Sequence, residues 1–118
     1  MNVMMLILEA PADFESRGDS PAATAYWQAW QSYSAAVNDK VVGGQVLNGP
    51  ETAVTLRVRD GVRQVQDGPF AASKEALGGY MIFEVDSMEE ALELASTCPA
   101  AASGAVELRP VVPMDAMT

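Results

Sequence analysis

Residues 54–70 read VTLRVRDGVRQVQDGPF, and this stretch decides more of the fold than any other part of the chain. Apolar and polar residues alternate along its first half, which places Val54, Leu56 and Val58 on one face of a strand. The pair Asp60-Gly61 follows, and both residue types tolerate positive φ. The sequence therefore predicts a β-hairpin with a two-residue turn.

The turn also fixes the register of the predicted hairpin. Counting outward from Asp60-Gly61 places Leu56 opposite Val65 and Val54 opposite Asp67. Because opposite residues share a face, we expect the carboxylate of Asp67 on the apolar side of the hairpin, packed against the rest of the protein.

The N-terminal third predicts a strand and a helix. Residues 2–8 are almost all apolar, which is typical of a central strand covered on both faces. Ser20 and Pro21 mark a helix start, with Ser20 as N-cap and Pro21 at the first position, where its missing N–H costs nothing. The helix carries an apolar stripe at Tyr26, Trp30, Tyr33 and Val37. Aromatic residues at this spacing, Trp27 included, are more often core than a stacking cleft.

Short elements are predicted on either side of the hairpin. Residues 45–47 predict an extended piece before it, and residues 73–77 predict a helical turn after it. Residues 80–85 then predict a strand with Met81 and Phe83 on one face.

The C-terminal third predicts a second helix and a last strand. The helix starts at Asp86 or Ser87, since each has an acidic residue three positions later, as in a capping box. Its predicted buried stripe is Met88, Ala91, Leu92 and Ala95. Pro99 is expected to end the helix, followed by a loop to residue 104 and a strand over 105–112.

Together these elements predict one domain over residues 1–118. The order strand, helix, hairpin, strand, helix, strand is typical of an α+β ferredoxin-like sandwich, with two main helices on one face of a mostly antiparallel sheet and the β-hairpin inserted. The other sheet face is then uncovered, and a second subunit is its usual cover. We therefore expect a homodimer.

Composition narrows the range of partners. The net charge of −9 repels phosphate backbones and anionic headgroups, and the seven basic residues are scattered, so we expect no direct nucleic-acid or membrane partner.

The single Cys98 cannot form an internal disulfide, and no His is present for the common zinc sites. We expect a cytoplasmic protein without a metal or cofactor. Cys98, beside Pro99 at a helix end, lacks the positive surroundings of a reactive thiol.

Several short motifs occur in a characteristic order. They are Asp67-Gly68-Pro69-Phe70, Lys74-Glu75, Leu77-Gly78-Gly79-Tyr80, Glu84, Asp86, Glu90-Ala91 and Glu107-Leu108-Arg109-Pro110. With them, nearly the whole chain resembles the YCII-related family, named for its DGPF motif. The resemblance implies a small ferredoxin-like protein of the dimeric α/β-barrel type, and most such relatives have no assigned activity. Many are encoded beside extracytoplasmic-function sigma factors, which implies a regulatory or accessory role.

The resemblance also bears on catalysis. Better-described relatives are thought to pair a His with the motif Asp as acid and base, but this chain has no His. Because His is the side chain whose ordinary pKa suits proton transfer near neutrality, such chemistry would fall to Asp67, Glu9, Glu84 or a tyrosine, each with a large pKa shift. An enzyme is therefore the less favoured interpretation.

Of these groups, Asp67 is the leading catalytic candidate, and two interpretations of it stay open. Burial on the hairpin would raise the pKa of its carboxyl group, whereas a nearby cation or backbone N–H groups would lower it. Alternatively, Asp67 accepts hydrogen bonds from the backbone that follows it and holds the loop, while Gly68-Pro69 ends the strand.

The candidate ligand-binding residues are Glu9, Arg57, Asp67, Lys74 and Tyr80, and no metal ligand is among them. Glu9 ends the first strand near a possible pocket mouth, although an exposed glutamate is the commoner case there. Arg57 lies on the polar side of its strand, where it forms an ion pair or binds an anion. Lys74 and Tyr80 are candidates because they belong to the motifs that carry the family resemblance.

Three classes of function are consistent with the sequence. The first is a homodimeric protein that binds a small ligand or serves an accessory role. The alternative is a small enzyme, of lyase, isomerase or hydrolase type, using Asp67 in a pocket between sheet and hairpin. A structural interaction module without a pocket is the third.

Overall fold

The computed structural model describes residues 1–71 and 73–117. Its main sheet has four strands in the order β2-β5-β1-β6, formed by β1 (Asn2–Glu9), β2 (Val41–Val46), β5 (Ala76–Glu84) and β6 (Ala105–Pro110). Every neighbouring pair is antiparallel. The predicted α+β class and the central position of the first strand are confirmed.

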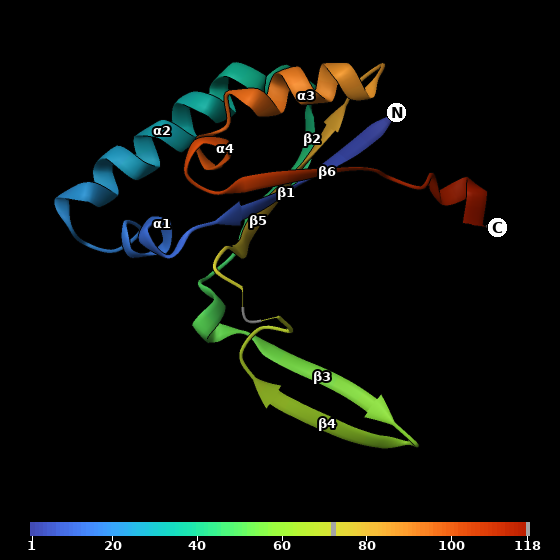
Figure 1. Ribbon diagram of the computed structural model, residues 1–118. Coiled ribbons are helices and arrows are strands. Elements are labelled where there is room, and N and C mark those ends of the chain that lie inside the picture. Colours follow the sequence, from blue (N-terminus) through green and yellow to red (C-terminus); the bar gives the residue numbers. More distant parts are fainter. Residues whose placement is uncertain (72, 118) are drawn as a thin grey trace.

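Two long helices, α2 (Pro21–Val37) and α3 (Met88–Ser96), lie on one face of the sheet (Figure 1). The core beneath them is centred on Val3, Met5 and Phe83, whose side chains have no exposed surface. Tyr33 ties the two helices together, because its hydroxyl donates to the carbonyl oxygen of Leu94 at 2.8 Å. The short helices α1 (Pro11–Glu15) and α4 (Pro99–Ser103) and the 3-10 turns Asn38–Lys40, Pro50–Thr52 and Met114–Met117 complete the fold.

The two helices start at the predicted serines, but only Ser87 caps its helix with a side-chain hydrogen bond; the Ser20 side chain makes none. Ser20 is the N-cap of α2 and Pro21 its first residue, as predicted. At α3, Ser87 is the N-cap, and its hydroxyl oxygen accepts the N–H of Glu90 at 3.1 Å. Of the two starts that the sequence left open, the structure selects Ser87.

The hairpin forms as predicted, from β3 (Val54–Arg59) and β4 (Val62–Asp67). At the turn, φ is 52° for Asp60 and 76° for Gly61, the positive pair that a tight two-residue turn requires. Leu56 pairs with Val65 and Val54 with Asp67, so the predicted register is confirmed.

The surroundings of the hairpin differ from the prediction. The two strands form a separate sheet that stands clear of the main body, on the side away from the helices (Figure 1). Its apolar side is open, with Leu56 54% and Val65 58% exposed. The expectation of a packed side is therefore wrong for the single chain, and Asp67 is exposed. Sequence alternation sets which residues share a face but does not determine what covers it.

Several elements have other bounds than predicted, because sheet pairing extends two strands beyond their local signals and other elements are set by packing. β2 begins at Val41, before the extended piece predicted at 45–47, and β5 begins at Ala76, where a helical turn was predicted. Gly78 and Gly79 therefore lie within a strand. Pro99 begins α4 instead of ending α3, and β6 stops at Pro110. Leu92, predicted to be buried, is 55% exposed, and Leu94 packs on the core instead.

The sheet face opposite the helices is uncovered within the chain. The side chains of Met4, Leu6 and Leu8 alternate with the buried ones along β1 and are only half-buried, so coverage on both faces is not achieved by one copy. Among the described residues, no helix is long and apolar enough to cross a membrane.

Candidate functional site

A cavity of about 370 Å³ lies between α2 and the β2-β5 side of the sheet. One wall is the α2 face that carries Trp27, Trp30 and Ser34, and the opposite wall is built from the glycine-rich backbone of β2 and β5. The cavity ends at a cluster of three polar side chains, Glu9, Arg17 and Tyr26. This pocket is the candidate site.

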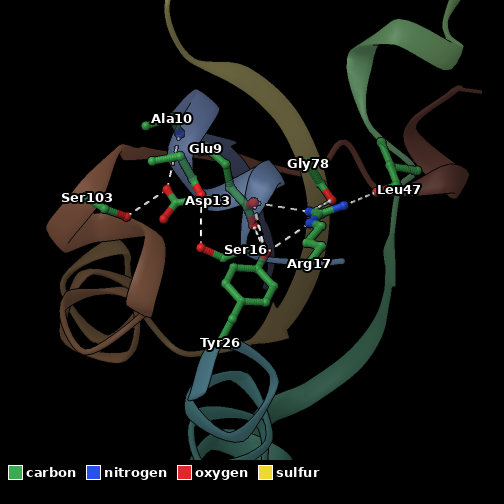
Figure 2. Close-up of polar contacts among 10 residues, drawn as sticks. Glu9, Ala10, Asp13, Ser16, Arg17, Tyr26, Leu47, Gly78 and Ser103 are labelled. Carbon is green, nitrogen blue, oxygen red and sulfur yellow. Dashed lines mark hydrogen bonds and ion pairs between the residues drawn. The ribbon is translucent and has the colours of Figure 1, made fainter. Parts of the chain in front are cut away.

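Glu9 is the buried member of the cluster, with 2% of its surface exposed. It is the last residue of β1, and the strand alternation that buries Val3, Met5 and Ile7 also turns Glu9 toward the helices. Its carboxylate accepts the hydroxyl of Tyr26 at 2.7 and 2.8 Å and a guanidinium N–H of Arg17 at 3.2 Å (Figure 2). The sequence favoured an exposed Glu9, and that expectation is wrong.

Arg17 holds the cluster to the rest of the protein. Its guanidinium donates to the carbonyl oxygens of Gly78, at 3.1 Å, and of Leu47, and its Nε donates to the Tyr26 hydroxyl at 3.1 Å. The ring of Phe14 lies 4.7 Å from its charged centre. Because every nitrogen of the guanidinium already has an acceptor, Arg17 is fixed in one orientation.

Gly78 leaves the space that Arg17 occupies. A Cβ atom at this position would lie 2.8 Å from Nη2 of Arg17 and 3.1 Å from Cδ of Glu9. Glycine is therefore required by the close approach of the ion pair to the strand. Next to it, a Cβ on Gly79 would lie 2.8 Å from the backbone oxygen of Gln45 in β2. The two glycines of the family motif thus serve the pocket and its wall.

The segment before Arg17 is held by its own polar contacts. Asp13 in α1 accepts the N–H of Ala10 at 3.2 Å and the hydroxyl of Ser103 in α4 at 2.8 Å (Figure 2). The first bond closes the start of α1, and the second joins α1 to α4, two short helices that could not persist alone. These bonds fix the turn from which Arg17 reaches back to Glu9.

Burial raises the pKa of Tyr26 to about 12, and its hydrogen bond to the Glu9 carboxylate contributes in the same direction. Tyr26 therefore keeps its proton at neutral pH and acts as a hydrogen-bond donor. The Cys98 thiol also has a raised pKa because it is buried, which agrees with an unreactive thiol.

The aromatic residues of α2 have two different roles. Tyr33 belongs to the core, as predicted. Trp27 and Trp30 are only half-buried and face the cavity, with Trp27 packed edge-to-face on Tyr26 at 4.8 Å between ring centroids. Trp30 also packs against the core, as predicted, whereas Trp27 lines the pocket and is not part of the core cluster.

The structure brings Glu9 and Tyr80 of the predicted site to the pocket and leaves the other candidates outside it. Arg57 lies on the hairpin, 5.1 Å from the ring of Phe70. Asp67 is on the opposite face of the hairpin, and Lys74 is exposed in the loop that follows. A role for these three in binding or catalysis stays a prediction.

The sequence analysis missed Arg17 and the pocket role of Tyr26. Two of the four hydrogen-bond partners of Arg17 are distant in sequence, since Gly78 is 61 residues and Leu47 is 30 residues away. The only local signal for a cation at this place was the alternation along β1. It turns Glu9 inward, and a buried carboxylate needs a cation beside it.

These features define a small α+β domain with one antiparallel main sheet, a two-helix layer and a pocket between them. Residues 1–115 match the YCII-related domain, and the chain belongs to the YCII-related family. The predicted membership of the YCII-related family is thus confirmed.

One curated relative is an uncharacterised protein of Rhizobium meliloti (strain 1021), 41% identical over 61 residues, which are 50% of this chain and 49% of that protein. The chain thus spans about half the length of this relative. A solved structure of 5-chloro-2-hydroxyhydroquinone dehydrochlorinase from Burkholderia phenoliruptrix, in complex with 2,5-dihydroxybenzoquinone, has a TM-score of 0.58 at 15% identity and covers 98% of both chains. At that identity the likeness shows the fold alone.

Proposed function

We propose that this protein binds a small, flat, uncharged organic molecule in the pocket under α2. The observation that carries the proposal is the cavity of about 370 Å³ with two indole side chains on its wall. Small-molecule sites span roughly 300–1,000 Å³ and are mostly apolar with a few fixed polar groups. Flat rings gain from offset or edge contacts with indoles, which favours an aromatic ligand.

The charges around the cavity support an uncharged ligand. Glu9 and Arg17 are the charged side chains among the described residues that line it, and they neutralise each other at 3.2 Å. A charged ligand would lose its hydration there without gaining a free counter-charge. The dehydrochlorinase bound to 2,5-dihydroxybenzoquinone suggests hydroxylated benzenes as the first class to test.

The test uses the natural fluorophores, because both tryptophans of the chain line the pocket. Hydroquinone is titrated into the protein in reducing buffer, with 4-hydroxybenzoate as the matched anion. We expect a saturable change in tryptophan emission with hydroquinone and a weaker one with the anion. Ser34→Leu, which fills the cavity from α2, should abolish the change, whereas Gln31→Leu on the exposed side of α2 should not. A linear response, equal in both variants, contradicts the proposal.

The proposal includes a homodimeric ferredoxin-like fold of the dimeric α/β-barrel type. The strand order β2-β5-β1-β6 and the helices on one face support it, as do the half-buried Met4, Leu6 and Leu8 on the other face. Light scattering at micromolar concentration should give about twice the 12.5 kDa chain mass. A mass equal to one chain contradicts the homodimer.

A cytoplasmic accessory role beside an extracytoplasmic-function sigma factor is proposed on the family resemblance alone.

A small enzyme is the second candidate. A buried carboxylate hydrogen-bonded to a tyrosine within the pocket favours it, and the fold is shared with a dehydrochlorinase. The test measures chloride release from 5-chloro-2-hydroxyhydroquinone. If a folded Asp67→Asn variant loses turnover, Asp67 is supported as acid and base. If only Tyr26→Phe loses turnover, the chemistry is assigned to the pocket. A rate equal to that in buffer contradicts activity on this substrate.

A further inference from the structure

The hairpin presents an apolar face that the single chain leaves open. Its six residues are Val54, Leu56, Val58, Arg63, Val65 and Asp67, as the cross-strand register requires. The four apolar members are between 53% and 64% exposed. A two-stranded hairpin alone is marginally stable in water, so an ordered hairpin of this kind needs a cover.

The charges on this face form an ordered pattern. The cross-strand pair Leu56 and Val65 occupies the centre, Asp67 lies beside Val54 at the base, and Arg63 lies beside Val58 near the tip. Asp67 and Arg63 are four residues apart on one strand, about 14 Å at the rise of an antiparallel strand, too far to pair with each other. Neither side chain has a hydrogen bond or ion pair within residues 1–71 and 73–117.

We propose that this face packs against the same face of a second copy of the chain. A two-fold axis in the plane between the hairpins, perpendicular to the strands, lays β3 on β3 and β4 on β4 in opposite directions. Leu56 and Val65 then meet their own counterparts at the axis. At each end, Arg63 lies over the second copy's Asp67, so both charges gain a partner.

The pattern selects this arrangement over its alternatives. An axis parallel to the strands would lay β3 on β4 and place Asp67 over an apolar Val54, leaving both charges unpaired. The opposite face of the hairpin is unsuitable, because Phe70 folds over Arg57 there and Thr55 donates to the carbonyl oxygen of Gly68 at 2.8 Å. A face that is complementary only to itself is typical of a two-fold contact between identical chains.

The area involved sets the expected strength. Two six-residue strands present a face of about 20 by 10 Å, far below the roughly 800 Å² that each partner buries in a standard interface. The hairpin contact alone is therefore too small to hold two chains together. It rests on the homodimer proposed above, whose other contacts would supply the remaining interface area. The hairpin projects from the main sheet on its uncovered side, which is where that second copy would lie (Figure 1).

The first experiment is cross-linking of the full chain with a short bismaleimide. Leu56→Cys should cross-link rapidly to a dimer because its thiol lies at the two-fold axis. Gln64→Cys, on the other face of the same hairpin, is the control and should react singly. The natural Cys98 is 2% exposed, so the unsubstituted chain serves as the blank. Equal cross-linking at positions 56 and 64 overturns the proposal.

The second experiment is a charge exchange, read out as the cross-linking rate in the Leu56→Cys background. Arg63→Asp and Asp67→Arg should each slow it about tenfold, because each places like charges opposite one another at both ends of the face. The double variant restores the opposite pairs and should recover the original rate. If Asp67→Arg accelerates the reaction and the double variant does not recover, the hairpin lies on the acidic body of the second copy and the proposed pairing is wrong.

Light scattering separates this inference from the proposed homodimer. A mass of two chains without cross-linking at position 56 refutes the hairpin contact and leaves the homodimer standing. A mass of one chain refutes both.

Discussion

The hydroxyl of Tyr26 donates to both oxygens of Glu9, at 2.7 and 2.8 Å, and so joins the middle of α2 to the end of β1. Arg17 supplies the balancing charge to the same carboxylate at 3.2 Å. The end of the pocket is therefore a neutral and rigid unit. We therefore expect changes in this unit to affect both the stability of the domain and the shape of the pocket.

Arg17→Met should destabilise the protein strongly, because it leaves the Glu9 carboxylate buried without its cation. We expect the free energy of unfolding to fall by about 3–5 kcal/mol, the usual cost of breaking a buried pair. Urea unfolding followed by circular dichroism measures it. Adding Glu9→Gln to this variant should recover part of the loss. Lys40→Met, which removes an exposed pair with Glu90, is the control and should change little. Equal losses in Arg17→Met and Lys40→Met would refute a buried ion pair.

Gly78→Ala should displace the guanidinium of Arg17, since the new methyl group would lie 2.8 Å from its Nη2. We expect a loss of about 1–3 kcal/mol in the free energy of unfolding, typical of overpacking, together with weaker hydroquinone binding. Gly18→Ala is the matched control, because the nearest atom to its Cβ is 3.9 Å away. Unchanged stability in Gly78→Ala would show that the strand yields and that the glycine is not required.

Stability should decline in alkali partly through Tyr26. Its pKa is raised from 10.0 to about 12 in the folded protein. Below pH 10 both states keep the proton, whereas between pH 10 and about 12 only the unfolded state loses it, so the free energy of unfolding falls as pH rises. The pKa of Tyr33 is also raised by burial, and it adds to the same decline.

Urea unfolding across this range compares the natural protein with Tyr26→Phe. The variant should be less stable at neutral pH, because it loses the bond to Glu9, but it should lose less stability per pH unit in alkali. Parallel pH profiles would be inconsistent with a raised pKa at Tyr26.

Gly61→Val should disrupt the hairpin turn, where φ is 76°. A β-branched residue in this conformation costs about 1–2 kcal/mol. Because the hairpin is a separate sheet, the loss should appear as faster amide hydrogen exchange in β3 and β4, with the main sheet unaffected. Exchange that is unchanged in the hairpin would refute the strained turn.

The sequence by itself determined the elements whose signals are local. The Asp60-Gly61 turn, the pairing of Leu56 with Val65 and the start of α2 at Pro21 follow from dihedral preferences and from alternation over a few residues. The family was also predicted from the sequence, and the match of residues 1–115 to the YCII-related domain confirms it.

Only the tertiary structure showed where the candidate pocket lies and that the apolar side of the hairpin is open in the single chain. The pocket cluster joins the end of β1, the turn after α1 and the middle of α2, and Arg17 reaches Gly78 across 61 residues. No periodicity records such a contact, because it depends on how whole elements pack. The same holds for the open side of the hairpin. Alternation places Asp67 among apolar residues, but what covers a face depends on how whole elements are arranged in space, since burial belongs to the folded structure and not to the strand.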